Sequence, residues 1–195
     1  MQHAFRLFAS VSLLLPFHIA TGQQPATDAT IAEAVSPLPQ SLRDGATVVT
    51  YDANGNPKVL RQGSNGITCS HDWPVPGAPP FAVRCHSEVL VPEHDKMVKL
   101  IASGKSHQQA EAEIEAETEA GTLQLPPPGT MIYFRSGKSA SDSKVEWIML
   151  LPNAKAEILG LSTKPSDTSP WMMLSGTPRA HVMLPQTKAT LAQGH

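Results

Sequence analysis

Cys69 and Cys85 are the two cysteines of this chain, and they enclose 15 residues. The segment 71–80 between them contains four prolines, which exclude regular helix or sheet there. In an oxidising compartment such a pair forms a structural disulfide. Closing a loop of this length is worth about 3 kcal/mol in the chain-entropy account. We therefore predict a bridge that clamps a stiff bend onto a small fold.

The N-terminus predicts an oxidising compartment. Arg6 precedes a mostly apolar run at 7–20, and the small residues Ala20 and Gly22 lie two apart, as a signal peptidase requires. We predict a signal peptide at 1–22, cleaved near Gly22, and a secreted or periplasmic mature protein.

A transmembrane anchor is the alternative for this run. It contains Ser10, Ser12 and His18, and it is shorter than the ~20 apolar residues that a membrane span needs. No later stretch is longer, so we expect no membrane span in the mature chain. The formal charge of −2 offers no basic surface for phosphates and disfavours nucleic acid as a partner. No other partner is indicated.

Composition and patterning predict an α+β fold. Eighteen prolines and thirteen glycines imply many turns and exclude a long helical bundle. Short β-branched and apolar runs predict an antiparallel sheet of about six short strands, with one or two packed helices. We expect an N-terminal tether at 23–45, a single domain at 46–185 and a polar tail at 186–195. The runs expected to form strands are 47–51, 58–61, 67–69, 130–134, 145–151, 171–174 and 180–184.

A charged helical segment is expected at 105–120. Its glutamates recur at every second position from Glu111 to Glu119, so a helix places like charges four residues apart. We expect a weakly held, solvated helix. Calcium binding is the alternative, but the Asp-rich loop of a calcium site is missing, and the sequence assigns the segment no role.

Two dense segments carry a resemblance to a family. They are Val59-Leu-Arg-Gln-Gly-Ser-Asn-Gly-Ile-Thr-Cys69 and Pro170-Trp-Met-Met-Leu-Ser-Gly-Thr-Pro-Arg-Ala-His-Val-Met-Leu-Pro185. With them, residues 46–185 resemble a group of small exported bacterial proteins that have no assigned activity. The resemblance implies export and a bacterial source, and it supplies no reaction, cofactor or catalytic residue. The acidic segment departs from that group.

Metal binding is the alternative to a structural disulfide. Thiolate and imidazole ligands for zinc or copper are present at Cys69, His71, Cys85 and His86, although not at zinc-finger spacing. Cys85 and His86 are adjacent, so on a strand they would point to opposite faces. A second set, which is either a soft-metal site or simply core, comprises Met172 or Met173 with His181 and Met183.

The sequence indicates no catalytic residue and no cofactor. The Gly-x-Ser-x-Gly motif of serine hydrolases does not occur. We interpret the chain as an exported, non-catalytic binding or structural module with one disulfide. The alternatives are a periplasmic enzyme with an unrecognised site and a metal-handling protein. A binding module needs an apolar patch or groove, whereas an enzyme needs a cleft with a perturbed titratable group.

Overall fold

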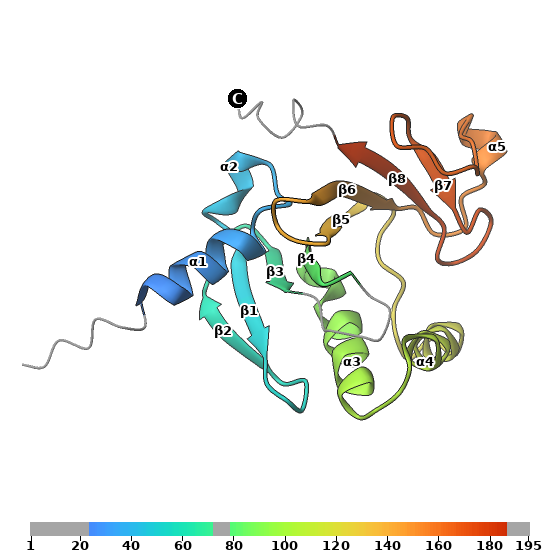
Figure 1. The fold of residues 1–195 in the computed structure, drawn as a ribbon. Helices are drawn as coiled ribbons and strands as arrows, with labels where there is room; N and C mark the ends of the chain where they lie inside the picture. The colour runs from blue at the N-terminus through green and yellow to red at the C-terminus, as the bar shows by residue number, and fades with distance from the viewer. Residues whose placement is uncertain (1–23, 72–78, 187–195) are drawn as a thin grey trace, which may run out of the picture.

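The computed structural model describes residues 24–71 and 79–186, which form an α+β fold around one mixed sheet (Figure 1). The predicted fold class is confirmed. The strands are β1 (Thr47–Tyr51), β2 (Pro57–Arg61), β3 (Ile67–His71), β4 (Phe81–Ser87), β5 (Thr130–Gly137), β6 (Ser143–Leu150), β7 (Trp171–Met173) and β8 (His181–Gln186). The helices are α1 (Gln24–Ala34), α2 (Gln40–Arg43), the 3-10 turn η1 (Glu88–Leu90), α3 (Val91–Ala102), α4 (His107–Glu119) and α5 (Ala156–Leu159).

The sheet has eight strands in the order β2-β1-β3-β4-β5-β6-β8-β7. All neighbours are antiparallel except β1 and β3, which pair in parallel. The sheet is therefore larger than the expected six strands, and it is mixed rather than purely antiparallel. The parallel pair arises because β2 returns along the outer edge of β1, so that the next strand, β3, joins the inner edge.

The strand that the sequence did not predict is β4, the neighbour of both β3 and β5. Its sequence, Phe-Ala-Val-Arg-Cys-His-Ser, alternates in side-chain type. Val83 and Cys85 lie on one face, and Arg84 and His86 lie on the other. This alternation divides the molecule into two sides with different chemistry.

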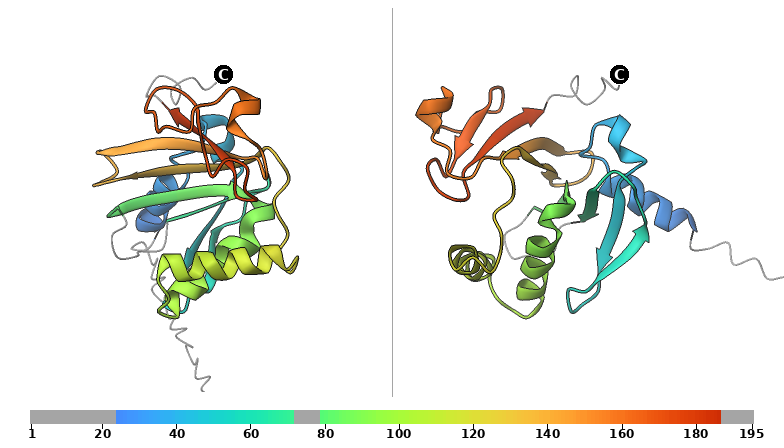
Figure 2. Two further views of the ribbon diagram at one scale, coloured as in Figure 1. Left: turned by 90° about the vertical axis from the view of Figure 1, so that its right-hand side faces the viewer. Right: turned by 180° about the vertical axis from the view of Figure 1, so that it is seen from behind.

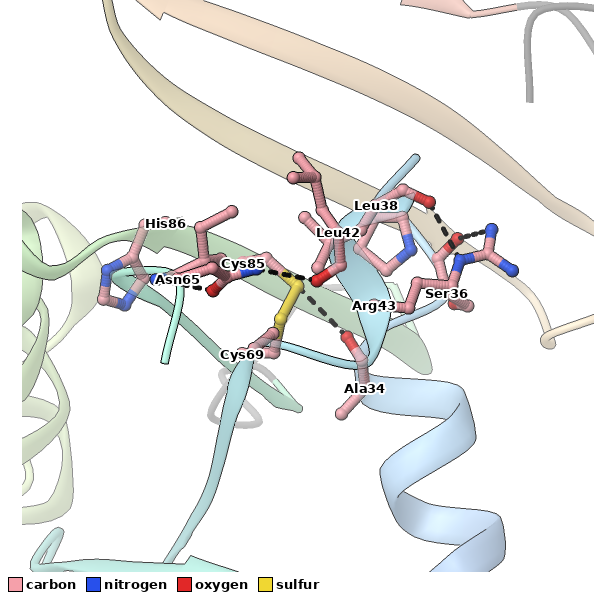
Figure 3. Close-up of a disulfide and its surroundings, with 12 residues drawn as sticks. Ala34, Ser36, Leu38, Leu42, Arg43, Asn65, Cys69, Cys85 and His86 are labelled. Atoms are coloured by element: carbon pink, nitrogen blue, oxygen red, sulfur yellow. Dashed lines mark hydrogen bonds between the residues drawn. A yellow bond between two sulfur atoms is a disulfide. The ribbon is translucent and has the colours of Figure 1, made fainter. Parts of the chain in front are cut away.

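The Cys85 side is the main core and contains the disulfide. Cys69 of β3 lies directly opposite Cys85 of β4, and both residues are fully buried. Figure 3 shows the bridge beside the carbonyl oxygen of Ala34, which is 3.3 Å from the Cys85 sulfur. Since a bridged sulfur carries no proton, this is a packing contact and not a hydrogen bond. The predicted disulfide is thus present, and an N-terminal segment covers it.

This covering segment differs from the expected tether at 23–45. Residues 24–34 form α1, which contacts β2, β3 and β4, and Ala34 and Leu38 are fully buried. The indole N–H of Trp147 donates to the carbonyl of Pro37 at 3.1 Å. The segment is therefore part of the core. The predicted signal peptide at 1–22 lies outside the described residues. Of the predicted polar tail at 186–195, only Gln186 is described, as the last residue of β8.

The other side of the sheet faces α3 and α4, which pack against each other (Figure 2). Pro92 stands in the first turn of α3, where its missing N–H leaves no helical hydrogen bond unmade. The acidic helix α4 is docked rather than solvated, since Ala110 and Ile114 are buried. Its charges are offset by cations from elsewhere in the chain, in the pairs Lys96–Glu117, Lys105–Glu113 and Arg179–Glu111.

Candidate functional site

A cleft of about 680 Å³ lies between the sheet and the α3–α4 pair. Large apolar lining residues come from η1, α3, α4, β5 and β6: Leu90, Met97, Ile101, Ile114, Ile132, Phe134, Ile148 and Leu150. The rim includes the exposed residues Glu115, Glu119 and Leu125, so the cleft opens to solvent beside the end of α4. The size and lining are typical of a small-molecule site.

Strand register builds the floor of the cleft. Arg84 pairs with Phe134 across β4 and β5, and His86 pairs with Ile132, which in turn pairs with Ile148 of β6. Residues paired across a ladder point to the same face. The Arg84 guanidinium carbon lies 5.4 Å from the centre of the Phe134 ring, in a cation–π contact. The floor is therefore apolar around one strongly basic group.

Two histidines meet between this floor and α3. The ring centroids of His86 and His94 are 4.8 Å apart, and Tyr51 packs edge-on against His94 at 5.8 Å. The Tyr51 hydroxyl donates to Oδ1 of Asp95 at 2.8 Å. Burial, His86 and Arg84 lower the pKa of His94 to about 2, so its ring is neutral. Its Nε2 is buried and has no hydrogen-bond partner among the described residues.

Glu93, the residue before His94, lines the same cleft. Burial raises the pKa of its carboxyl, although Arg179 and Arg84 act in the opposite direction. Within residues 24–71 and 79–186 the carboxylate makes no ion pair or hydrogen bond. The Glu93 carboxyl thus has a raised pKa inside the cleft, although two arginines lie within electrostatic reach of it.

A small ion-pair network closes the cleft between α4 and β8. Nη2 of Arg179 is 3.1 Å from Oε1 of Glu111, and Nδ1 of His107 is 3.5 Å from Oε2 of the same carboxylate. Nδ1 of His181 lies 2.8 Å from the carbonyl oxygen of Arg179. Arg179 belongs to the second family-like segment, which therefore contributes to the wall of the cleft.

The first set of predicted metal ligands is not assembled. Cys69 and Cys85 are bonded to each other, so neither is a thiolate. Nε2 of His71 lies 3.6 Å from Oε2 of Glu33, and His71 stands on the same sheet face as the disulfide, whereas His86 stands on the opposite face, although both residues line the cleft. In the described part of the chain, no group of three or more His, Cys, Asp or Glu side chains is arranged to hold a metal ion.

The second predicted set is also divided. Met172 pairs with Val182 and is buried with Ala156, whereas His181 pairs with Met173 on the opposite face. Met183 shares the face of His181 and is buried. Met172 therefore belongs to the core, and of the set only His181 lines the cleft.

Sequence analysis did not single out Arg84, Glu93 or Arg179 as site residues. The available signal was the alternation of β4, where Arg84 and His86 stand on the face opposite a cysteine. The approach of Glu93 and Arg179 depends on helix packing, which sequence spacing does not reveal.

Comparisons with known proteins yield no match to a protein family, a curated protein or a solved structure. Within residues 24–71 and 79–186, every helix is too short or too polar to cross a membrane.

Proposed function

We propose that this chain is an exported, non-catalytic binding module that holds a small amphipathic molecule in the cleft between the sheet and α3–α4. The cleft itself carries this proposal: its apolar walls surround a few charged groups, in a volume of about 680 Å³. Ligand sites typically have volumes of roughly 300–1,000 Å³ and combine an apolar lining with a few polar groups that orient the ligand.

The proposal of export rests on two features of the chain. One is the leader-like sequence at 1–22, and the other is the buried bridge between Cys69 and Cys85. The family-like segments at 59–69 and 170–185 suggest a bacterial source. Intact mass of the native protein tests both features, since cleavage near Gly22 and loss of two hydrogen atoms on oxidation of the two thiols each change the mass.

Blocking the cleft tests ligand binding. Ile148 projects from β6 into the cleft, and Ile148→Phe adds bulk there. Ile158→Phe is the matched control, because Ile158 is 77% exposed on α5. With 1-octanol as an uncharged probe, we expect saturable binding to wild type and to Ile158→Phe, and at least a ~10-fold loss for Ile148→Phe. Equal affinity in all three proteins, or no binding to wild type, contradicts the proposal.

Proton-transfer catalysis is the second candidate function. It is favoured by one observation, namely that Glu93 and His94 are adjacent in the cleft and both have displaced pKa values. Under this candidate, hydrolysis of p-nitrophenyl octanoate is lost in Glu93→Gln, while octanol binding remains. Absence of turnover, or turnover that survives the substitution, contradicts catalysis at Glu93.

A further inference from the structure

We propose that one face of the β7–β8 hairpin is a binding site for copper(I), formed by Met173, His181 and Met183. The three side chains supply two thioethers and one imidazole, and this combination of soft sulfur and imidazole ligands suits copper(I). The inference goes beyond the proposed function, because it concerns a metal ion at the edge of the sheet and needs no ligand in the cleft.

Strand register places the three side chains together on one face of the hairpin. Met173 of β7 is the direct partner of His181 of β8 in the antiparallel ladder, and Met183 follows two residues later along β8. Side chains directly opposite each other have Cβ atoms about 4.5–5.5 Å apart, and long side chains also reach diagonal neighbours at about 7–8 Å. Methionine is unbranched and flexible, so it adapts to such positions. The two sulfur atoms and the His181 ring can therefore reach a common ion.

A hydrogen bond prepares His181 as a ligand. Its Nδ1 lies 2.8 Å from the carbonyl oxygen of Arg179, and because a carbonyl only accepts, Nδ1 carries the proton of the neutral ring. The lone pair is then on Nε2. Metal-binding histidines typically donate their other ring N–H to a backbone carbonyl or a carboxylate in this way, which fixes both the tautomer and the ring orientation. His181 therefore already has the second-shell partner that a ligand needs.

The two methionines of the proposed site differ from a neighbour that serves the core. Met172 lies on the opposite face of β7, where it is fully buried with Ala156 and Val182. Met173 is 38% exposed on the last strand of the sheet, so its thioether gains little from burial (Figure 1). Met183 is only 7% exposed. An ion therefore enters from the side of Met173 and is held against the buried sulfur of Met183.

The surroundings of the site accept a soft monovalent cation. Arg179, two residues before His181, is paired with Glu111 at 3.1 Å, so its positive charge is offset. Trp171 is the direct partner of Met183 on the same face, and the face of an indole ring attracts cations. Zinc fits less well, because it takes thiolate, imidazole and carboxylate ligands, and only one of the three proposed ligands is of these kinds.

The first experiment titrates the purified native protein with silver(I) in chloride-free buffer. Silver(I) shares the ligand preference of copper(I) and does not change its oxidation state, so it is a clean probe of the site. Binding is followed by NMR of methyl-labelled methionine and of the histidine ring nitrogens. We expect saturable binding of one ion that shifts the methyl signals of Met173 and Met183 and the Nε2 signal of His181, whereas the methyl signal of Met172 stays in place.

The second experiment removes one ligand at a time. Met173→Leu keeps the volume of the side chain, and His181→Asn keeps an N–H donor for the Arg179 carbonyl but has no Nε2. Each variant should bind silver(I) at least ~10-fold more weakly, a loss that even second-shell substitutions cause at metal sites. Met172→Leu is the matched control, since it is the same substitution one residue away on the opposite face, and it should keep the wild-type affinity. Copper(I), kept reduced by ascorbate and titrated against a competing chelator, should give the same order of affinities.

Several results would refute the site. One is wild-type affinity for silver(I) in Met173→Leu or in His181→Asn. Another is a titration in which the signals that shift belong to other methionines and histidines, or in which wild type does not bind the ion. Displacement of silver(I) by an equimolar amount of zinc would show that the site is not selective for soft ions. The proposed function is unaffected by any of these results, because octanol binding in the cleft is measured without metal.

Discussion

His86 of β4 and His94 of α3 pack against each other with their ring centroids 4.8 Å apart and their planes tilted by 55°, at the contact between the sheet and its covering helix. Two imidazolium ions at this distance would repel each other strongly, and burial penalises each charge further. Consistent with this, the pKa of His94 is lowered to about 2. The α3–sheet contact therefore depends on at least one neutral histidine.

The first prediction is that acid destabilises the protein through His94. An unfolded histidine titrates near pH 6.5, whereas folded His94 has a pKa of about 2. Below about pH 6.5 the unfolded state binds a proton that the folded state does not, so the free energy of unfolding falls by up to about 1.4 kcal/mol per pH unit. Urea unfolding of wild type and His94→Gln at pH 5 and pH 7 measures this effect, and the pH 5 loss is expected to be smaller in the variant.

Two comparisons make this prediction specific. His107→Gln is the control, because the His107 side chain is 51% exposed, and it should keep the wild-type pH dependence. Glu93 acts with the opposite sign. Because its pKa is raised in the folded state, the folded protein binds this proton more tightly than the unfolded chain does, and the free energy of unfolding falls as rising pH removes the proton. A wild-type pH profile retained in His94→Gln would show that the buried imidazole does not control acid stability.

Local patterns in the sequence identified most of the sheet. Seven of the eight strands overlap runs of β-branched and apolar residues that sequence analysis assigned to strands. The Cys69–Cys85 bridge was also predicted, since the pairing of two cysteines follows from their count.

The cleft was not predictable in the same way. β4 follows a proline-rich segment and carries Arg84 and His86, so its composition does not indicate a central strand. The covering role of residues 24–45 was missed because α1 has little amphipathic pattern of its own. In both cases non-local packing determines the structure. The family resemblance and the signal peptide remain predictions.

The second prediction concerns the disulfide. Both cysteines are fully buried and join adjacent strands, so Cys69→Ala/Cys85→Ala removes a cross-link within the core. In the chain-entropy account we expect a loss of about 3 kcal/mol in the free energy of unfolding. Urea titrations of the oxidised protein and the double variant measure it. A loss below about 1 kcal/mol would mean that β3 and β4 are held together by their ladder and by α1 alone.

The third prediction tests whether the N-terminal segment belongs to the core. Leu38 is fully buried against the disulfide cluster, so Leu38→Ala leaves a cavity and should cost about 2–5 kcal/mol. Ile158→Ala is the control, since a side chain that is 77% exposed should change stability by no more than about 0.5 kcal/mol. Denaturation followed by tryptophan fluorescence is suitable, because Trp147 donates to Pro37 in this segment. Equal stability of the two variants would support a tether at 23–45 instead.

The fourth prediction concerns Gly63, in the first of the two family-like segments. A Cβ at this position would lie 2.3 Å from the carbonyl carbon of Ala46, the carbonyl oxygen of Gly45 and the amide nitrogen of Thr47. All three are backbone atoms and cannot rotate away. The segments 45–47 and 63–64 are further joined here by two hydrogen bonds. The Ser64 amide donates to the carbonyl oxygen of Gly45 at 2.7 Å, and the Gly63 amide donates to the Thr47 hydroxyl at 3.0 Å.

Gly63→Ala must therefore push the 45–47 segment away from 63–64 and break these bonds. We expect a loss of about 3 kcal/mol or more, at the upper end of overpacking costs, together with faster amide exchange at Ser64 and Asn65. Gly104→Ala is the comparison: its Cβ would meet no atom within 4 Å, so only the strain of φ +95° remains, about 1–2 kcal/mol. Exchange at Ser64 should be unchanged in that variant. If Gly63→Ala leaves the amide exchange of Ser64 at the wild-type rate, the two segments do not pack as closely as the structure places them.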